Sequence, residues 1–279
     1  MSKFNGCVAV VTGAGSGIGR ALALELASRG AKLAISDLNK DSLDETAQLL
    51  HDSGSEIIHH QLDVADQNAV FDYAAIVAEQ YQQVNLVINN AGVALASGPL
   101  WETSIDDFKW LMNINFYGVL YGTKAFLPLM QEAQWGHIVN ISSLFGLVSV
   151  PEQNAYNASK FAVRGLTEAL RHELEVADSS VSCTSVHPGG IRTNIARSAR
   201  ITEGSAMADP DEREISLQNF DKLARTTPES AAQQILRAVE KNKRRLLIGA
   251  DARIIDKIQR LFPSGYGWVM KKIVSRASR

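Results

Sequence analysis

The chain has 279 residues, of which 46% are hydrophobic, and its 28 basic and 30 acidic side chains leave a net charge of -2. This composition can bury one large core and excludes a disordered, a collagen-like or a disulfide-stabilised chain. The two cysteines, Cys7 and Cys183, lie far apart in apolar segments. We therefore expect buried thiols and no metal site or disulfide framework.

The first residues, MSKFNGCVAV, lead directly into strand-like sequence. They lack the charged region, the long apolar stretch and the small-residue cleavage site of an export signal. No window approaches the roughly 20 uninterrupted apolar residues that cross a bilayer. We therefore expect a cytoplasmic protein without a transmembrane helix.

Short apolar runs alternate along the chain with longer segments of helical periodicity. The runs, which predict strands, cover 7–11, 32–36, 56–61, 85–89, 137–141, 181–186 and 245–248. Helices are expected over 18–28, 41–51, 67–81, 104–130 and 154–176. The alternation predicts an α/β fold, a Rossmann-like doubly wound sheet of seven mainly parallel strands flanked by helices.

A glycine-rich turn follows the first predicted strand and leads into a helix. The residues of this turn that we expect to bind a cofactor are Gly13, Ser16, Gly17, Ile18 and Gly19. Without Cβ atoms in the way, backbone amides and the positive end of the helix dipole can approach a pyrophosphate there. The position between a strand and a helix favours a dinucleotide site over an ordinary glycine turn.

Asp37, at the end of the second predicted strand, lies 18 positions after Gly19 and predicts the kind of dinucleotide. Its carboxylate is expected to accept hydrogen bonds from both adenosine ribose hydroxyls and to repel the 2'-phosphate of NADP. Neither Ser16 nor Leu38 supplies a compensating positive charge, so we expect NAD, with NADP disfavoured. Arg20, next to the turn, is a cation that could reach such a phosphate.

Tyr156 and Lys160 lie one helical turn apart on a single face of the helix predicted over 154–176. An ammonium beside a phenol favours the phenolate, so the pair is expected to lower the tyrosine pKa from about 10 toward neutral pH. The hydroxyl would then exchange a proton with a substrate oxygen. By itself, the same pair is also common on an exposed polar face.

Further motifs follow in order along the chain, each after a predicted strand or inside a predicted helix. They are Asp63-Val64, Asn89-Asn90-Ala91-Gly92, Asn115-Phe116-Tyr117-Gly118, Ile141-Ser142-Ser143 and Pro188-Gly189-Gly190-Ile191-Arg192-Thr193. Together with the glycine-rich turn and the Tyr156 to Lys160 element, they make the chain resemble the classical short-chain dehydrogenase/reductases over most of its length.

The resemblance implies a catalytic set of Asn115, Ser143, Tyr156 and Lys160. Tyr156 would donate or accept the substrate proton, and Ser143, in preference to Ser142, would hydrogen-bond the substrate oxygen. Lys160 would hold the nicotinamide ribose and tune Tyr156. Asn115 would bend its helix and anchor a water that leads protons out through Lys160.

The resemblance also implies cofactor contacts, most of them made by the backbone. The implied residues are Asp63, Val64, Asn90, Gly92, Pro188, Gly189, Ile191 and Thr193, with Tyr156 and Lys160 at the nicotinamide ribose. The first two would flank the adenine, and the next two would let the chain pass close to the adenine ribose. Ile191 and Thr193 would fix the nicotinamide carboxamide, whereas the neighbouring His187 is expected to be a core residue.

The segment 194–227 breaks the rhythm of strands and helices, and we expect it to form a mobile lid over the site of a single domain, 1–250. The apolar side chains expected to line the substrate pocket are Leu144, Phe145, Leu147 and Val148. This lining favours a lipophilic alcohol or carbonyl compound. Because relatives commonly associate through the helices that begin at Ser104 and Asn154, we expect a homodimer or homotetramer.

The C-terminal extension, 251–279, lies in a strongly basic part of the chain. From Lys241 onward, eleven Lys or Arg stand against two Asp, whereas the first 240 residues carry 17 basic and 28 acidic side chains. A helix over 252–262 would be amphipathic, and the stretch 266–274 again mixes aromatic, apolar and basic residues. Two interpretations stay open: peripheral contact with an anionic membrane surface, or packing on this domain or a second subunit.

These features predict an NAD(P)-dependent oxidoreductase that moves a hydride between a nicotinamide cofactor and an alcohol, ketone or aldehyde. The alternative is a non-catalytic dinucleotide-binding regulator or scaffold with a membrane-associating tail, which would show a damaged catalytic set. A sugar-nucleotide epimerase or dehydratase would show a different glycine spacing and a larger C-terminal substrate domain. No motif indicates a nucleic-acid partner.

Overall fold

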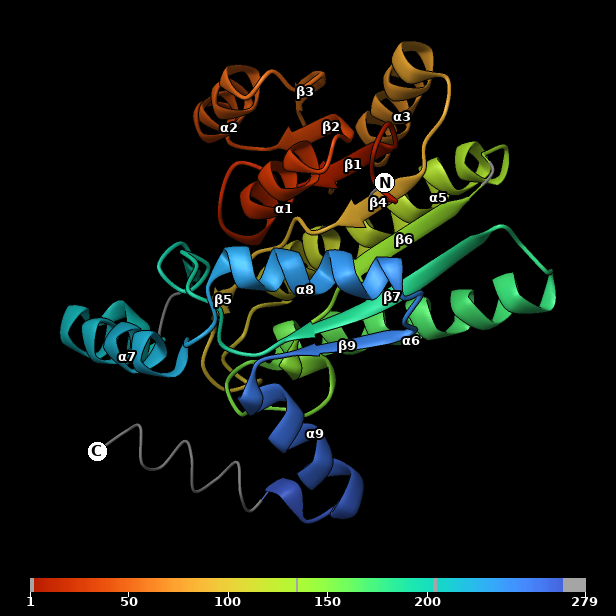
Figure 1. The fold of residues 1–279 in the computed structure, drawn as a ribbon. Coiled ribbons are helices and arrows are strands. Elements are labelled where there is room, and N and C mark those ends of the chain that lie inside the picture. Colours follow the sequence, from red (N-terminus) through yellow and green to blue (C-terminus); the bar gives the residue numbers. More distant parts are fainter. Residues whose placement is uncertain (1–2, 134, 203–204, 268–279) are drawn as a thin grey trace.

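The computed structural model describes residues 3–133, 135–202 and 205–267. Seven strands form the central sheet in the order β3-β2-β1-β4-β6-β7-β9, and every neighbouring pair is parallel (Figure 1). Their bounds are β1 (Val8–Thr12), β2 (Lys32–Asp37), β3 (Ile57–Gln61), β4 (Leu86–Asn89), β6 (Gly136–Ile141), β7 (Val181–Pro188) and β9 (Arg245–Ile248). The predicted Rossmann-like sheet is confirmed, and each strand overlaps its expected range.

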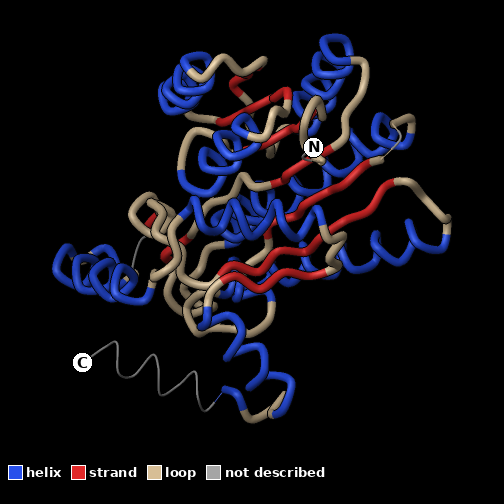
Figure 2. The backbone as a smooth tube through the Cα atoms, viewed as in Figure 1, coloured by secondary structure: helices blue, strands red, loops and turns tan. Residues whose placement is uncertain are grey.

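The alternation of side chains along β1 shows why both faces of the sheet are covered. Val8 and Val10 belong to one buried cluster, whereas Ala9 and Val11 belong to a second cluster on the opposite face. The helices of the first face are α3 (Gln67–Tyr81), α5 (Gly118–Gln131) and α6 (Asn154–Val176), and those of the second are α1 (Gly17–Ser28), α2 (Lys40–Asp52) and α8 (Pro228–Glu240). Figure 2 shows the strands enclosed between these two helical layers.

The single helix predicted over 104–130 is interrupted, which corrects that prediction. Helix α4 (Ile105–Met112) leads into a π-helical turn, η1 (Asn113–Tyr117), before α5 begins. Inside this turn the Asn115 side chain accepts a hydrogen bond from the Val93 N–H at 2.8 Å and donates one to the Val93 carbonyl at 2.9 Å. These two bonds anchor the widened turn to the loop after β4, at the residue where the resemblance implied a bend.

The segment 194–227 contains regular structure that the sequence analysis did not foresee. Its elements are β8 (Arg200–Ile201), η3 (Ala206–Ala208) and α7 (Pro210–Leu223). β8 pairs in parallel with β5 (Leu95–Ala96), and Asp209 caps α7 by accepting hydrogen bonds from the Asp211 and Glu212 amides. Figure 1 shows β5 and α7 on the side to which the strand arrows point, so the segment lies at the carboxyl ends of the sheet. Its mobility stays a prediction.

After β9 the chain continues as α9 (Ala250–Leu261), close to the helix predicted over 252–262. Ala252 on its inner face is buried in one cluster with three side chains that follow β6, namely Leu144, Leu147 and Val148. The sequence analysis places these three in the substrate pocket. That prediction is wrong, because with exposed fractions of 7%, 1% and 0% they pack beneath α9. The end of the basic stretch, 268–279, lies outside the described residues.

Both cysteines are buried free thiols, as predicted. Burial raises the pKa of Cys7 and of Cys183 to about 12, which makes their thiolates scarce at neutral pH. Among the residues that the structure describes, no three or more His, Cys, Asp or Glu gather as a metal site would require. Within the same residues, every helix is too short or too polar to span a bilayer.

Candidate active site

The sequence motifs converge at one edge of the sheet, where the parallel strands end. The glycine-rich turn follows β1, Asn90 and Gly92 follow β4, Ser143 follows β6, and Pro188 ends β7. β1 lies between β2 and β4, so the order in which the chain adds strands reverses beside it. In open α/β sheets this reversal leaves a crevice outside the carboxyl ends, where ligands bind.

The glycine-rich turn needs its glycines for steric reasons. Gly13 and Gly17 have φ angles of +66° and +53°, and a Cβ on Gly13 would lie 2.8 Å from the Ala91 Cα. A Cβ on Gly19 would lie 2.0 Å from the Gly13 carbonyl oxygen, so the first turn of α1 packs directly on the loop. Ser16 precedes α1 without a capping hydrogen bond from its side chain, and Ile18 packs against the core. The first amides of α1 thus face a turn in which Gly13, Gly15 and Gly17 carry no Cβ atom, which fits a pyrophosphate.

Asp37 lies beside this turn and is held by backbone amides. Its Oδ2 accepts a hydrogen bond from the Gly15 N–H at 2.9 Å, and its Oδ1 accepts one from the Asn39 N–H at 2.9 Å. The Arg20 guanidinium donates to the Gly15 carbonyl and forms an ion pair with Glu45. Arg20 is therefore already engaged within the protein, while the Asp37 carboxylate remains partly exposed.

Asn90 joins the loop after β4 to the turn after β1. Its side-chain amide donates to the carbonyls of Thr12 and Gly13 at 3.0 and 3.1 Å. In return, the Thr12 hydroxyl accepts hydrogen bonds from the Asn90 and Ala91 amides. Thr12 is the first residue of the glycine-rich motif, which runs from Thr12 to Gly19, but its role in joining the two loops could not be foreseen from the sequence.

Asp63 and Val64 follow β3 on the side of the sheet expected to hold the adenine. The Asp63 carboxylate is exposed and accepts a hydrogen bond from the Ala65 N–H at 2.9 Å. Val64 is buried against Gly118, where an added Cβ would lie 2.8 Å from the Val64 Cγ2. The first residue of α5 therefore packs directly on Val64.

Ser143, Tyr156 and Lys160 meet at the carboxyl end of β6. The Lys160 Nζ lies 5.6 Å from the centre of the Tyr156 ring and donates a hydrogen bond to the Ile141 carbonyl at 3.1 Å. The Ser143 hydroxyl hydrogen-bonds the Tyr156 side chain. Lys160 is only 4% exposed, whereas Ser143 and Tyr156 are partly exposed. A buried cation thus lies beside two hydroxyl-bearing residues that are themselves only partly buried.

The hydrogen bonds of Ser142 support the choice of Ser143. Ser142 is 2% exposed, and its hydroxyl donates to the Lys160 carbonyl at 2.7 Å. The backbone carbonyl of Ser143 is hydrogen-bonded to the His187 Nδ1 at 3.0 Å. His187 is fully buried, and burial lowers its pKa to about 3, so it is the neutral core residue that the sequence predicts.

Gly92 lies where Asn115 and Lys160 converge. A Cβ on Gly92 would lie 3.2 Å from the Asn115 Oδ1 and 3.4 Å from the Lys160 Nζ. Asn115 is fully buried, and its amide approaches the Ser159 hydroxyl at 3.5 Å. The four residues of the predicted catalytic set thus form one connected group; the water relay through Asn115 stays a prediction.

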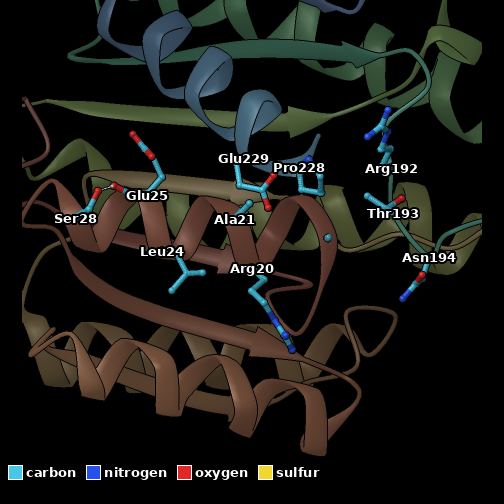
Figure 3. Close-up of a pocket in the computed structure, with 11 residues that line it drawn as sticks. Arg20, Ala21, Leu24, Glu25, Ser28, Arg192, Thr193, Asn194, Pro228 and Glu229 are labelled. Atoms are coloured by element: carbon cyan, nitrogen blue, oxygen red, sulfur yellow. Dashed lines mark hydrogen bonds between the residues drawn. The ribbon is translucent and has the colours of Figure 1, made fainter. Parts of the chain in front are cut away.

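The loop after β7 returns to the glycine-rich turn. A Cβ on Gly17 would lie 3.1 Å from the Thr193 Cγ2. Ile191, two residues before Thr193, is buried. Figure 3 shows Arg192, Thr193 and Asn194 across from the side chains of α1, and these residues line a cavity of about 380 Å³. The two ends of the expected cofactor site, the turn after β1 and the loop after β7, therefore face each other.

The family model described as short chain dehydrogenase matches residues 7–204. The chain belongs to the short-chain dehydrogenase/reductase family. The putative oxidoreductase SadH of Mycobacterium tuberculosis (strain ATCC 25618 / H37Rv) is 46% identical over 267 residues, which cover 95% of this chain and 94% of that protein. The CLA biosynthesis dehydrogenase/reductase of Lactiplantibacillus plantarum is 32% identical over 276 residues, 95% of this chain and 96% of its own.

Solved structures of similar proteins agree with this membership. A short chain dehydrogenase/reductase from Burkholderia phymatum in complex with NAD has a TM-score of 0.84 and 34% identity, and the match covers 94% of this chain and 96% of that chain. An alcohol dehydrogenase from the archaeon Thermococcus sibiricus complexed with 5-hydroxy-NADP has a TM-score of 0.71 and 27% identity, with 87% and 95% covered. The chain is therefore an oxidoreductase of a nicotinamide-dependent family.

Burial governs the protonation of Tyr156 and Lys160. It raises the pKa of the Tyr156 phenol, an effect that the hydrogen bond from Ser143 partly offsets. It also lowers the pKa of Lys160 to about 8. The expectation that Lys160 lowers the Tyr156 pKa below its ordinary value is therefore wrong for this structure, because the lost hydration of the phenolate outweighs the effect of Ser143. At neutral pH the phenol is protonated and Lys160 is charged.

Replacing Lys160 with methionine should stabilise the cofactor-free protein at neutral pH. The lysine pKa is 10.5 before burial and about 8 in the fold, so its charge opposes folding below pH 8 by roughly 3 kcal/mol. The penalty disappears as the pH rises from about 8 to 10.5, because the unfolded chain then binds more protons than the folded one. Urea titrations of both proteins across this range measure the difference.

The free energy of unfolding of Lys160→Met should exceed that of the parent at pH 7, and the excess should shrink toward pH 10.5. Lys124→Met, at an exposed position of α5, is the control and should show no such pH dependence. An excess that is absent at pH 7, or that grows with pH, contradicts the assigned burial of Lys160.

Proposed function

We propose that this protein transfers a hydride between NAD and an alcohol or carbonyl substrate, with Tyr156 as the acid and base. The observation that carries the proposal is the connected group of Ser143, Tyr156, Lys160 and Asn115 beside the glycine-rich turn. This group offers a proton donor, a second hydroxyl and a buried cation at the carboxyl ends of the strands. A non-catalytic dinucleotide-binding scaffold has no need of all three.

Each residue has its own task in this mechanism. The Ser143 hydroxyl donates a hydrogen bond to the substrate oxygen and stabilises the charge that develops there. Tyr156 gives its phenolic proton to that oxygen in ketone reduction and takes a proton from it in alcohol oxidation. Lys160, fixed by the Ile141 carbonyl, keeps a positive charge close to the phenol and reduces the cost of the phenolate.

The cofactor would supply the hydride chemistry when it is bound. The residues that would hold it are Gly13, Ser16, Gly17, Ile18, Gly19 and Asp37 on the adenosine and pyrophosphate side, Asp63, Val64, Asn90 and Gly92 around the adenine and its ribose, and Pro188, Gly189, Ile191 and Thr193 at the nicotinamide. Asp37 favours NAD, since a 2'-phosphate there would meet a carboxylate while Arg20 is engaged by Gly15 and Glu45.

The substrate in this proposal is lipophilic. Phe145 packs edge-on against the Tyr156 ring with 5.9 Å between ring centres, so one side of the reacting phenol is apolar. A cavity of about 340 Å³ adjoins the start of α6, and its apolar lining residues are Pro99, Leu100, Trp101, Val150 and Pro151. Trp101 is 84% exposed there, which leaves a large apolar surface for a ligand. A steroid-like, retinoid-like or long-chain compound matches this lining.

A turnover assay tests the reaction and the cofactor together. Steroid, retinoid, aliphatic and hydroxyacyl alcohols, with the matching carbonyl compounds, are offered with NAD(H) or NADP(H) and followed at the absorbance band of the reduced nicotinamide. We expect the lipophilic members of the panel to be converted. The kcat/KM for NAD should exceed that for NADP by about tenfold or more, because one unfavourable charge contact of about 1.4 kcal/mol corresponds to a factor of ten.

Asp37→Ala should narrow the gap between the two cofactors, whereas Asp41→Ala, on the exposed start of α2, should leave it unchanged. Equal or better use of NADP by the parent contradicts the assignment of NAD. If NADH binds but no member of the panel is converted in either direction, the non-catalytic regulator becomes the better account.

We propose that the outer face of α9 contacts anionic membranes and that the protein is cytoplasmic and peripheral to a membrane surface. Ile254 and Leu261 on this helix and Phe262 directly after it are 57%, 73% and 62% exposed. Arg253 and Lys257 are exposed on the same helix. Exposed apolar and basic side chains on one helix match the headgroup region of an anionic bilayer. The inner face of α9 packs on the domain. Packing and membrane contact would therefore use opposite faces of the same helix.

Sedimentation with vesicles tests this contact. The parent should pellet with phosphatidylserine-containing vesicles and far less with phosphatidylcholine alone, because both apolar burial and charge attraction contribute. The triple variant Ile254→Gln, Leu261→Gln, Phe262→Gln should stay in the supernatant. Ile215→Gln with Leu223→Gln on α7, which are 49% and 66% exposed, is the matched control and should pellet like the parent. Unchanged pelleting of the triple variant excludes this face.

A homodimer or homotetramer through α4 and α6 is also part of the proposal. Ile105 on α4 is 69% exposed, and Tyr117 on η1 and Phe161 on α6 are 40% and 36% exposed. These apolar side chains provide surface that a second copy would bury.

A further inference from the structure

Asp251 connects the C-terminal helix to the loop after β7. It lies in the first turn of α9, and its Oδ2 accepts a hydrogen bond from the Gly190 N–H at 2.7 Å. Gly190 precedes it by 61 residues in the sequence. The two meet because β7 and β9 are neighbouring strands whose ends are level, with Pro188 opposite Ile248 (Figure 1).

The Asp251 carboxylate lies in the space beside Gly189 and Gly249, where neither residue has a Cβ atom. A Cβ on Gly189 would lie 2.1 Å from its Oδ2, and a Cβ on Gly249 would lie 2.3 Å from its Oδ1. Gly249 also has a φ of +96°, which disfavours any other residue. The Gly189 N–H is used by the Ile248 carbonyl at 2.9 Å, so Asp251 takes the next amide of the loop. The aspartate side chain is therefore just long enough to reach from the start of α9 to the Gly190 amide.

The other side of the loop is fixed by the end of the segment 194–227. The Arg192 N–H donates to the Thr226 carbonyl at 2.9 Å, and a Cβ on Gly190 would lie 2.9 Å from the Ala224 Cα. The loop thus lies between Asp251 and 223–226, and it leads directly to Ile191 and Thr193.

We propose that Asp251 is a positioning residue for the nicotinamide end of the cofactor, acting through the Gly190 amide. The inference rests on the proposed function, in which Ile191 and Thr193 fix the nicotinamide carboxamide. In this role Asp251 sets the position of the backbone that leads to Ile191 and Thr193 and would not itself contact the cofactor. A purely structural role is the competing account, because an acid in the first turn also stabilises a helix through its dipole.

Binding of two ligands separates these accounts. NADH reaches both ends of the site, whereas ADP-ribose lacks the nicotinamide and reports on the adenosine and pyrophosphate end alone. The dissociation constants of both are measured by calorimetry, with kcat and KM for NAD beside them, for the parent and for Asp251→Ala, Asp251→Glu and Asp251→Asn. Asp256→Asn is the matched control, because Asp256 anchors α9 through Arg245 and Arg260 without touching the loop.

We expect Asp251→Ala and Asp251→Glu to weaken NADH binding by about tenfold, the effect of losing one charged hydrogen bond, while ADP-ribose binding is unchanged. Glutamate keeps the charge at the start of α9 but is too long for the space beside Gly189 and Gly249. Asp251→Asn, with the same length and an acceptor oxygen, should restore most of the NADH affinity. Asp256→Asn should lower the melting temperature but leave the ratio of the two affinities as in the parent.

Two results overturn the inference: an unchanged affinity ratio in Asp251→Glu, or equal losses for both ligands in every Asp251 variant. Should Asp251→Ala fail to fold, Asp251→Glu and Asp251→Asn still decide, because both keep a polar group at the helix start. A parent that binds NADH no better than ADP-ribose instead overturns the proposed function and is thereby distinguished from a failure of this inference.

Discussion

Lys160 carries a positive charge into the interior, where 4% of its surface is exposed and burial lowers its pKa to about 8. Much of the surrounding structure serves to hold it there. The Ile141 carbonyl accepts its hydrogen bond, and Gly92 leaves the space that its ammonium and the Asn115 amide occupy. A group that costs stability at neutral pH and lies beside a partly exposed phenol is typical of a site selected for chemistry. Tyr156 lies one turn before Lys160 on α6, and its side chain interacts with Ser143.

The location of this site follows from the sequence because parallel strands send all their carboxyl ends to one edge. A motif that follows a predicted strand is therefore placed in three dimensions as soon as the fold is known. Asp37 at the end of β2, Asn90 after β4 and Ser143 after β6 show this directly. The periodicity that predicts the strands thus also predicts which side chains become neighbours.

Features that depend on tertiary contacts could not be predicted in this way. The π-helical turn at Asn115 exists because its side chain bonds the backbone of Val93, which no local pattern reveals. Helix α7 buries only Leu217 among its own residues, so its apolar periodicity is weak. The raised pKa of Tyr156 depends on how much water the fold removes from the phenol. Leu147 is buried because α9 packs against it, which is a contact between distant parts of the sequence.

Helix α9 connects the proposed membrane surface to the chemistry. Its inner face covers the side chains that follow Ser143, and its first turn supports the loop after β7. A lipophilic substrate dissolved in a bilayer and a helix resting on that bilayer would thus meet at one end of the molecule.

In the proposed mechanism the Tyr156 phenol, placed by Lys160 and Ser143, transfers the proton of the reaction. The most direct test of this step is the kcat of Tyr156→Phe with a substrate that the parent converts, measured together with the dissociation constant of NADH. We predict that kcat falls by about 10² to 10⁴, the contribution of a positioned acid and base, while NADH binding is retained. A Tyr156→Phe protein that turns over as fast as the parent would contradict the account.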